Sequence, residues 1–262
     1  MTRISRHRFK EILTIFAMVG IGPAQISAQD RVVVPRAEAR MRQADADYHR
    51  GLEAAEGNGG RRDYAAAARY YRSAAENGHI PAQYNLAYLY ENGLGVKQDF
   101  SEAAAWYRKA ADQGDAESQN DLGVLYSTGQ GVPLDDVEAV RLYRLAASQD
   151  DPEGISNLAS MLLKGRGVPR DPDQALELFA KAASRGYSVA QNNLAIMYAN
   201  GAAGKPDYVK AYAWLDLAAA EISNASELRD KLAKVMTPVQ LTEARQLAEQ
   251  RRKEIAGKDE KK

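Results

Sequence analysis

The chain has 262 residues, 45% of them apolar, which is enough for one large domain or an array of repeats. Its 35 basic and 35 acidic residues balance, so the charge points to neither a nucleic-acid partner nor an anionic membrane surface. The absence of cysteine excludes disulfides, thiolate metal sites and a cysteine nucleophile.

Residues 1–28 have the pattern of a secretory signal peptide. The basic stretch MTRISRHRFK precedes an apolar run over residues 12–22, and ISA at residues 26–28 resembles a cleavage site before Gln29. The alternative is an uncleaved anchor, but the run is well short of the roughly 20 residues that a spanning helix needs. We therefore expect an exported protein with no membrane span after cleavage, and the periplasm is favoured over secretion or the ER lumen.

Residues 29–43 include the β-branched stretch VVVP, which predicts an extended N-terminal arm. From residue 44 onward, a step of 36 residues relates five segments of the chain. The step preserves several series: Asp63, Asp99, Asp135, Asp171 and Asp207; Ala67, Ala103, Ala139, Ala175 and Ala211; Leu86, Leu122, Leu158 and Leu194; Gly93, Gly129, Gly165 and Gly201. The units are a degenerate first repeat over 44–80 and four full repeats over 81–116, 117–152, 153–188 and 189–220.

Each unit carries two apolar stripes at helical spacing, and the aspartate series stands where helix N-caps are expected. Trp106 and Tyr107 are adjacent aromatic residues that could line a ligand pocket or belong to the core. Their equivalents in the other units are large apolar residues of mixed type, so a core position is predicted.

Residues 221–256 depart from the repeat and are expected to form capping helices over the last unit, with 257–262 as a solvated tail. Thr237 with Gln240 resembles a helix start. Asn224 matches a glycosylation sequon, but helix capping is the favoured role.

One helical hairpin cannot bury its own apolar face, whereas stacked hairpins can. The sequence therefore predicts an all-α fold: a right-handed α/α superhelical solenoid of about five 36-residue helix-turn-helix repeats with C-terminal capping helices. The stretch LAYLYENGLGVKQDFSEAAAWYRKAADQG resembles the Sel1-like repeat family, a relative of the tetratricopeptide repeats. The loop of the last unit departs from the family pattern at Ala203. The resemblance covers roughly residues 46–220 and implies a protein-interaction scaffold, frequently exported.

No catalytic motif or metal-ligand spacing is evident in the sequence. His79 is expected to be an exposed turn residue, and His49 has no second ligand nearby in the sequence. The stretches GLGV, GQGV and GRGV lack a preceding strand and recur in each repeat, so they are interpreted as turns rather than nucleotide-binding loops. We expect no cofactor, no metal and no enzymatic activity.

Positions that vary between the units can encode a partner, and the first helix of each unit would line a concave groove. Twelve groove residues are predicted to bind a protein or peptide partner: Tyr84, Tyr88, Glu91, Asn120, Val124, Ser127, Ser156, Ser160, Leu163, Asn192, Ile196 and Ala199. Tyr84 and Tyr88 are the predicted anchors, unless the first unit packs over them. The recurrent Asn85, Asp121, Asn157 and Asn193 are interpreted as structural hydrogen-bonding residues.

The sequence therefore favours an exported, non-catalytic adaptor. A cell-envelope enzyme or glycan-binding protein is the alternative, and a homo-oligomeric structural protein is a third reading.

Overall fold

The computed structural model describes residues 30–57, 60–202 and 204–259, so the predicted signal peptide lies outside the described residues. This part of the chain is helical and has no strand, as the sequence predicted. The helices are α2 (Asp30–Glu56), α3 (Tyr64–Glu76), α4 (Ile80–Asn92), α5 (Phe100–Ala111), α6 (Ala116–Thr128), α7 (Asp136–Ser148), α8 (Pro152–Lys164), α9 (Pro172–Ala183), α10 (Ser188–Ala199), α11 (Tyr208–Ala218), α12 (Ala225–Ala233) and α13 (Pro238–Asp259). None of them is long and apolar enough to cross a membrane.

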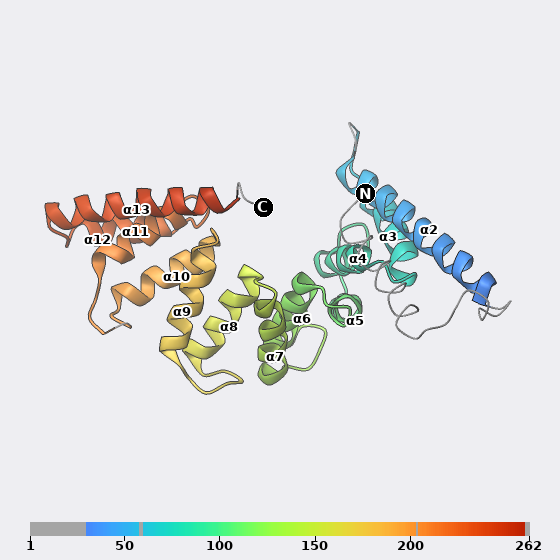
Figure 1. Cartoon of the computed structure of the whole chain (residues 1–262), viewed down its shortest axis with the longest axis horizontal. Helices are drawn as coiled ribbons and strands as arrows, with labels where there is room; N and C mark the ends of the chain where they lie inside the picture. The colour runs from blue at the N-terminus through green and yellow to red at the C-terminus, as the bar shows by residue number, and fades with distance from the viewer. Residues whose placement is uncertain (1–29, 58–59, 203, 260–262) are drawn as a thin grey trace.

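The helices stack as consecutive hairpins along a curved path from α2 to α13, and both end helices rise on the same side of the bend (Figure 1). We call α4, α6, α8 and α10 the inner helices, and α3, α5, α7, α9 and α11 the outer helices. The inner helices α6 and α8 also contact each other across the intervening α7, as the tighter layer of a curved stack does. The fold is the solenoid that the 36-residue step predicted.

An aspartate N-cap begins each outer helix. The Asp99 carboxylate accepts hydrogen bonds from the backbone N–H groups of Ser101 and Glu102, at 2.9 and 3.0 Å. The N–H of Asp99 itself donates to the carbonyl of Tyr90 at 2.9 Å. This bond joins the start of α5 to the end of α4. It uses the N–H group of Asp99 that would donate to the glutamate side chain in a complete capping box.

The second glycine of each inner-to-outer loop lies directly on the preceding repeat. Gly131 has φ +71°, and a Cβ there would lie 2.2 Å from the carbonyl carbon of Phe100 at the start of α5. Gly95 and Gly167 approach the previous outer helix in the same way. The glycine loops are therefore joints between repeats, and the departing residue of the last loop, Ala203, lies outside the described residues.

The adjacent aromatics of α5 belong to the core, as predicted. Trp106 is 5% exposed and Tyr107 is fully buried. Small residues on the inner helices admit such rings: a Cβ on Gly123 of α6 would lie 2.7 Å from the Tyr143 ring of α7. Close packing of this kind fixes the spacing of inner and outer helices, and so aligns the inner helices with one another.

The N-terminal end differs from the sequence prediction. Residues 30–56 form the single helix α2, so the extended arm predicted over 29–43 is wrong. The β-branched stretch is short, and the following RAEARMRQADADY is rich in good helix formers. Propensity over the longer segment therefore decides the conformation.

The C-terminal helices cover the last repeat, and Asp216 of α11 ties them together. It accepts hydrogen bonds from Arg229 of α12 and Arg252 of α13, both at 2.9 Å. Arg251 lies over the buried Trp214 ring, with its guanidinium carbon 5.1 Å from the ring centre. These contacts occupy the face on which a further repeat would otherwise pack.

The two predicted C-terminal helix starts behave differently. Thr237 and Gln240 form both bonds of a capping box, at 2.9 and 3.2 Å, whereas Asn224 occupies the N-cap position of α12 without a side-chain bond. The predicted tail at 257–262 begins too early, because α13 continues through Asp259. A single glycine at 257 costs only about 1 kcal/mol in a helix, and the residues around it are ordinary helix formers.

Candidate partner-binding face

One stripe at helical spacing on each inner helix carries the predicted binding residues, and the 36-residue step makes these stripes equivalent. On α4 the stripe consists of Pro81, Tyr84, Asn85, Tyr88 and Glu91, which lie at helical spacing. We call the four stripes on α4, α6, α8 and α10 together the inner face. They lie on successive helices along the bend shown in Figure 1.

The twelve residues predicted to bind a partner differ in accessibility. Tyr88 is 46% exposed and Ile196 is 39% exposed. Asn120 and Ser156 are each only 2% exposed, so they support the face rather than offer a surface. The other eight are partly buried: Tyr84, Glu91, Val124, Ser127, Ser160, Leu163, Asn192 and Ala199.

The two tyrosines of α4 have different environments. The Tyr84 ring lies 5.7 Å from the Tyr107 ring, and its phenol hydrogen-bonds to the Asp121 carboxylate. Burial raises the pKa of Tyr84 above its ordinary range, and the Asp121 charge adds to the shift. Tyr84 is therefore mainly part of the packing between repeats, whereas Tyr88 offers its ring to solvent.

A hydrogen-bonded polar network runs across the inner face. The Asn120 amide nitrogen donates to Asp121 at 3.1 Å and to Glu153 of the next repeat at 3.3 Å. The Asn157 side-chain amide donates to the side-chain oxygen Oδ1 of Asn120 at 2.8 Å. The network thus links α6 to α8 and holds two carboxylates within one patch.

A separate hydrogen bond joins α5 to the end of α4. The buried Tyr107 phenol donates to Glu91 at 2.7 Å. Burial raises the pKa of Asp121 to about 7, and the negative charges of Glu91 and Glu153 add to the shift. Burial also raises the pKa values of Glu117 and Glu153, and nearby carboxylates reinforce both shifts.

No cation of the described residues neutralises this patch. Glu91, Glu117, Asp121 and Glu153 take part in none of the ion pairs of that part of the chain. Glu91 and Asp121 are partly buried, and a partly buried carboxylate without a counter-ion is costly because burial removes hydration without supplying a partner charge. The inner face is therefore under electrostatic stress in the free protein.

The repeats themselves show which part of this arrangement the fold requires. Asn85, Asn157 and Asn193 occupy the position of Asp121 in the other three full units. The amide of Asn85 hydrogen-bonds with the phenols of Tyr48 and Tyr71, so a neutral side chain of the same shape serves the fold there. The architecture needs a hydrogen-bonding residue at this position and does not need a charge.

The sequence prediction missed one position of the inner face. Glu117, Glu153 and Val189 lie seven residues before Val124, Ser160 and Ile196, and therefore on the same stripe. All three are exposed. Extending the stripe by two turns toward the helix start would have found them.

His79 is not the exposed turn residue that the sequence predicted. It is the N-cap of α4, where its Nδ1 accepts from the N–H of Ala82 at 3.2 Å. Its ring lies 4.4 Å from the Tyr48 ring, and burial lowers the pKa of the imidazole. Among the described residues, no group of three or more histidine and acidic side chains could hold a metal ion.

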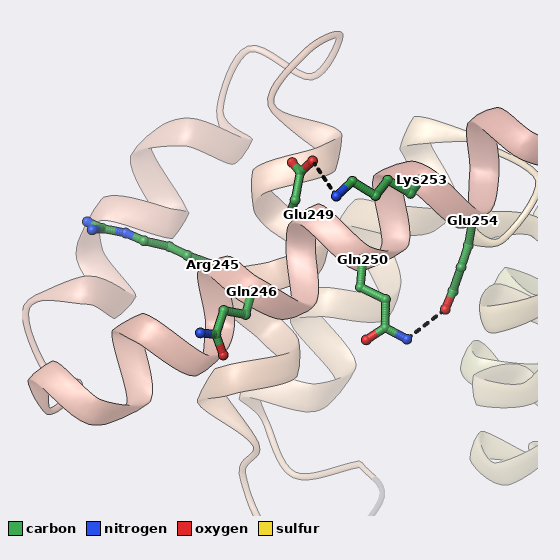
Figure 2. Close-up of a pocket in the computed structure, with 6 residues that line it drawn as sticks. All are labelled: Arg245, Gln246, Glu249, Gln250, Lys253 and Glu254. Carbon is green, nitrogen blue, oxygen red and sulfur yellow. Dashed lines mark hydrogen bonds and ion pairs between the residues drawn. The ribbon is translucent and has the colours of Figure 1, made fainter.

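A shallow pocket on α13 offers no second site. Figure 2 shows that its lining comes from this one helix, and Glu249 pairs with Lys253 at 3.6 Å while Gln250 donates to Glu254 at 2.8 Å. The lining residues are Arg245, Gln246, Glu249, Gln250, Lys253 and Glu254. Side chains paired along a single helix describe a solvated surface, because no second element encloses a ligand.

Comparison with known proteins agrees with the fold. The Sel1 repeat model matches residues 44–79, 80–115, 116–151, 152–187 and 188–221. The crystal structure of c5321, a protective antigen of uropathogenic Escherichia coli with an SLR fold, is 34% identical with a TM-score of 0.77. That alignment covers 92% of this chain and 52% of the other, so the chain spans about half the length of that relative.

A Sel1 repeat protein from Oxalobacter formigenes is 28% identical with a TM-score of 0.70, over 80% of this chain and 86% of the other. No curated protein sequence matches the chain. The repeat model covers more than half of the sequence, and its units coincide with the helical hairpins of the structure. The chain belongs to the Sel1 repeat family.

Proposed function

We propose that this chain is an exported, non-catalytic scaffold that binds a protein or peptide partner on its inner face. The observation that carries the proposal is the exposure of large apolar side chains there: Tyr88 at 46%, Val189 at 40% and Ile196 at 39%. Such side chains leave much of their apolar surface in solvent, and exposed tyrosine is favoured at binding hot spots. A curved stack presents them along one continuous track, which suits an extended segment or a partner helix.

The exported location rests on the signal-peptide pattern of residues 1–28. The similar Escherichia coli protein is described as a protective antigen, a description that suits an exported protein. We expect cleavage before Gln29, which mass spectrometry of the protein recovered from the periplasm of an expressing bacterium would test. A mature chain that still begins at Met1 would contradict the proposed export.

Tyr88→Ala is the sharpest test of the binding face. The ring is 46% exposed, so its removal should leave the fold intact while weakening partner capture at least tenfold. Tyr84→Ala is a poorer probe, because Tyr84 packs on Tyr107 and its loss would also disturb the core. The matched control is Tyr70→Ala, which removes a 37% exposed ring from the outer helix α3.

The measurement is affinity capture from the native envelope fraction with wild type, Tyr88→Ala and Tyr70→Ala chains starting at Gln29. The proposal expects a protein enriched by wild type and by Tyr70→Ala and lost with Tyr88→Ala. Equal recovery by all three chains would place binding elsewhere on the protein.

A further inference from the structure

The charge of the solenoid is divided unevenly between its two layers. The inner helices carry four carboxylates and one cation, Lys164, at the exposed end of α8. The outer helices carry seven carboxylates and eight cations within their bounds, and an aspartate caps the start of each. A chain that is neutral overall therefore presents a negative inner face, and this sign attracts positively charged partners.

The negative charge on α6 is not a requirement of the repeat. Asp121 stands where the other full units have asparagine, and its carboxylate lies near those of Glu91 and Glu153 without a counter-ion in the described residues. Since the charge opposes folding, the structure gives no reason for it within the free protein. A cation supplied from outside would remove the repulsion on docking.

The chemistry of the inner face changes one repeat further on. Val189 of α10 is the equivalent of Glu117 and Glu153, and Ile196 lies seven residues later on the same stripe. They are 40% and 39% exposed, so the acidic stripes of α6 and α8 continue into an apolar stripe on α10. The face is thus ordered along its length, with a tyrosine on α4, carboxylates on α6 and α8, and aliphatic side chains on α10.

We propose that the inner face recognises a basic-apolar protein segment, whose lysine or arginine side chains lie against Glu117, Asp121 and Glu153 and whose next apolar side chains lie against Val189 and Ile196. The inference rests on the proposed function and names the chemistry of its partner. Charge complementarity selects the cations, and the neighbouring exposed aliphatic side chains select the apolar residues.

The geometry of the stack gives the spacing of such a segment. The stripes of α6 and α8 lie on helices that contact each other directly, so they are separated by ~10 Å, the distance of packed helices. An extended chain advances ~3.3 Å per residue, so it offers one side chain to each repeat about every three residues. A suitable probe is a 12-residue serine-based peptide with two lysines three residues apart and two leucines about three residues further on.

The test measures binding of this labelled peptide by fluorescence anisotropy at physiological salt. Two further peptides replace the lysines by glutamate or the leucines by serine. The inner variant carries Glu117→Gln, Asp121→Asn and Glu153→Gln. The matched outer variant carries Glu102→Gln, Asp173→Asn and Glu177→Gln, which remove the same charge from exposed positions on outer helices.

The inference expects the inner variant to raise the Kd for the lysine-leucine peptide at least tenfold, while the outer variant stays within twofold of wild type. The glutamate peptide should bind at least tenfold more weakly, and Val189→Ser with Ile196→Ser should erase the difference between leucine and serine peptides. Equal weakening by the inner and outer variants would show general charge attraction and would overturn the inference.

The inference and the proposed function fail differently. If envelope capture depends on Tyr88 but neither the inner variant nor Val189→Ser with Ile196→Ser alters peptide binding, the proposed binding face stands and the basic-apolar partner is wrong. If the glutamate peptide binds best and Tyr88→Ala weakens it, the charge assignment is likewise overturned. If Tyr88→Ala does not reduce envelope capture and wild type does not bind the lysine-leucine peptide, both the proposed function and the inference are refuted.

Discussion

Replacing Asp121 with asparagine should stabilise the protein, and the effect should depend on pH. Its pKa is about 7 in the folded chain against 3.8 for the ordinary group, a difference of about 3 units. At ~1.36 kcal/mol per unit, the carboxylate opposes folding by about 4 kcal/mol above pH 8. Asparagine keeps the shape but loses one accepting oxygen, worth about 1 kcal/mol, which leaves a net gain of about 3 kcal/mol.

The direction of the pH dependence follows from proton binding. Between about pH 4 and pH 7 the folded chain holds a proton on Asp121 that the unfolded chain has released, so this group makes the free energy of unfolding fall as pH rises. Near pH 4, close to the ordinary value of 3.8, the folded chain is protonated at this site and the unfolded chain is roughly half protonated, so most of the penalty is absent. There the lost hydrogen bond should make Asp121→Asn neutral or slightly destabilising.

Hydrogen exchange followed by mass spectrometry measures this locally, which suits a stack whose repeats unfold piecewise. A gain of ~3 kcal/mol slows exchange of α6 amides roughly 150-fold at pH 8. Asp173→Asn, an exposed change on α9, is the control and should alter nothing. The reasoning is refuted if Asp121→Asn destabilises α6 at pH 8, or if its effect is the same at pH 4 and pH 8.

Two further predictions concern joints of the solenoid. Gly131→Ala should lower the free energy of unfolding by about 3 kcal/mol, because a Cβ would lie 2.2 Å from the Phe100 carbonyl carbon. Gly114→Ala, with φ +93° and open space around it, should lower it by about 1 kcal/mol. Equal losses of stability in urea denaturation would contradict the contact between repeats at Gly131. Thr237→Ala should destabilise the start of α13 by about 1 kcal/mol by removing a capping box, whereas Asn224→Ala should have little effect, since Asn224 makes no side-chain cap bond. Hydrogen exchange should therefore become faster in the first turn of α13 with Thr237→Ala and stay unchanged in the first turn of α12 with Asn224→Ala. Faster exchange in α12 and unchanged exchange in α13 would contradict the assignment.

Most of the fold was predictable because the same pattern of apolar, capping and glycine residues recurs in five units of the sequence. The 36-residue step identified the hairpins, and the substitution of large apolar residues at the Trp106 position identified the core. The errors at the two ends of the chain fall where nothing repeats. The conformation of residues 30–43 depended on balancing a β-branched stretch against the helix formers after it.

The candidate face was harder to predict from periodicity. The helical period placed Tyr88 and Ile196 correctly on an exposed stripe, and it placed Asn120 there although the structure buries it. Burial of that side chain depends on Glu153 and Asn157, which approach it only when the next repeat stacks. A contact between repeats cannot be deduced from the pattern within one of them.

The loop glycine resting on the preceding helix has a consequence for how such proteins change length. Each unit carries one half of each of its two joints: Gly131 reaches back to the unit before, and the helix start at Asp136 receives Gly167 of the unit after. A duplicated stretch of 36 residues would therefore bring both halves with it, and a deleted one would take both away. Duplication or loss of a whole unit adds or removes one step of the track without cutting a joint, so the reach of the molecule can evolve independently of the stability of its core.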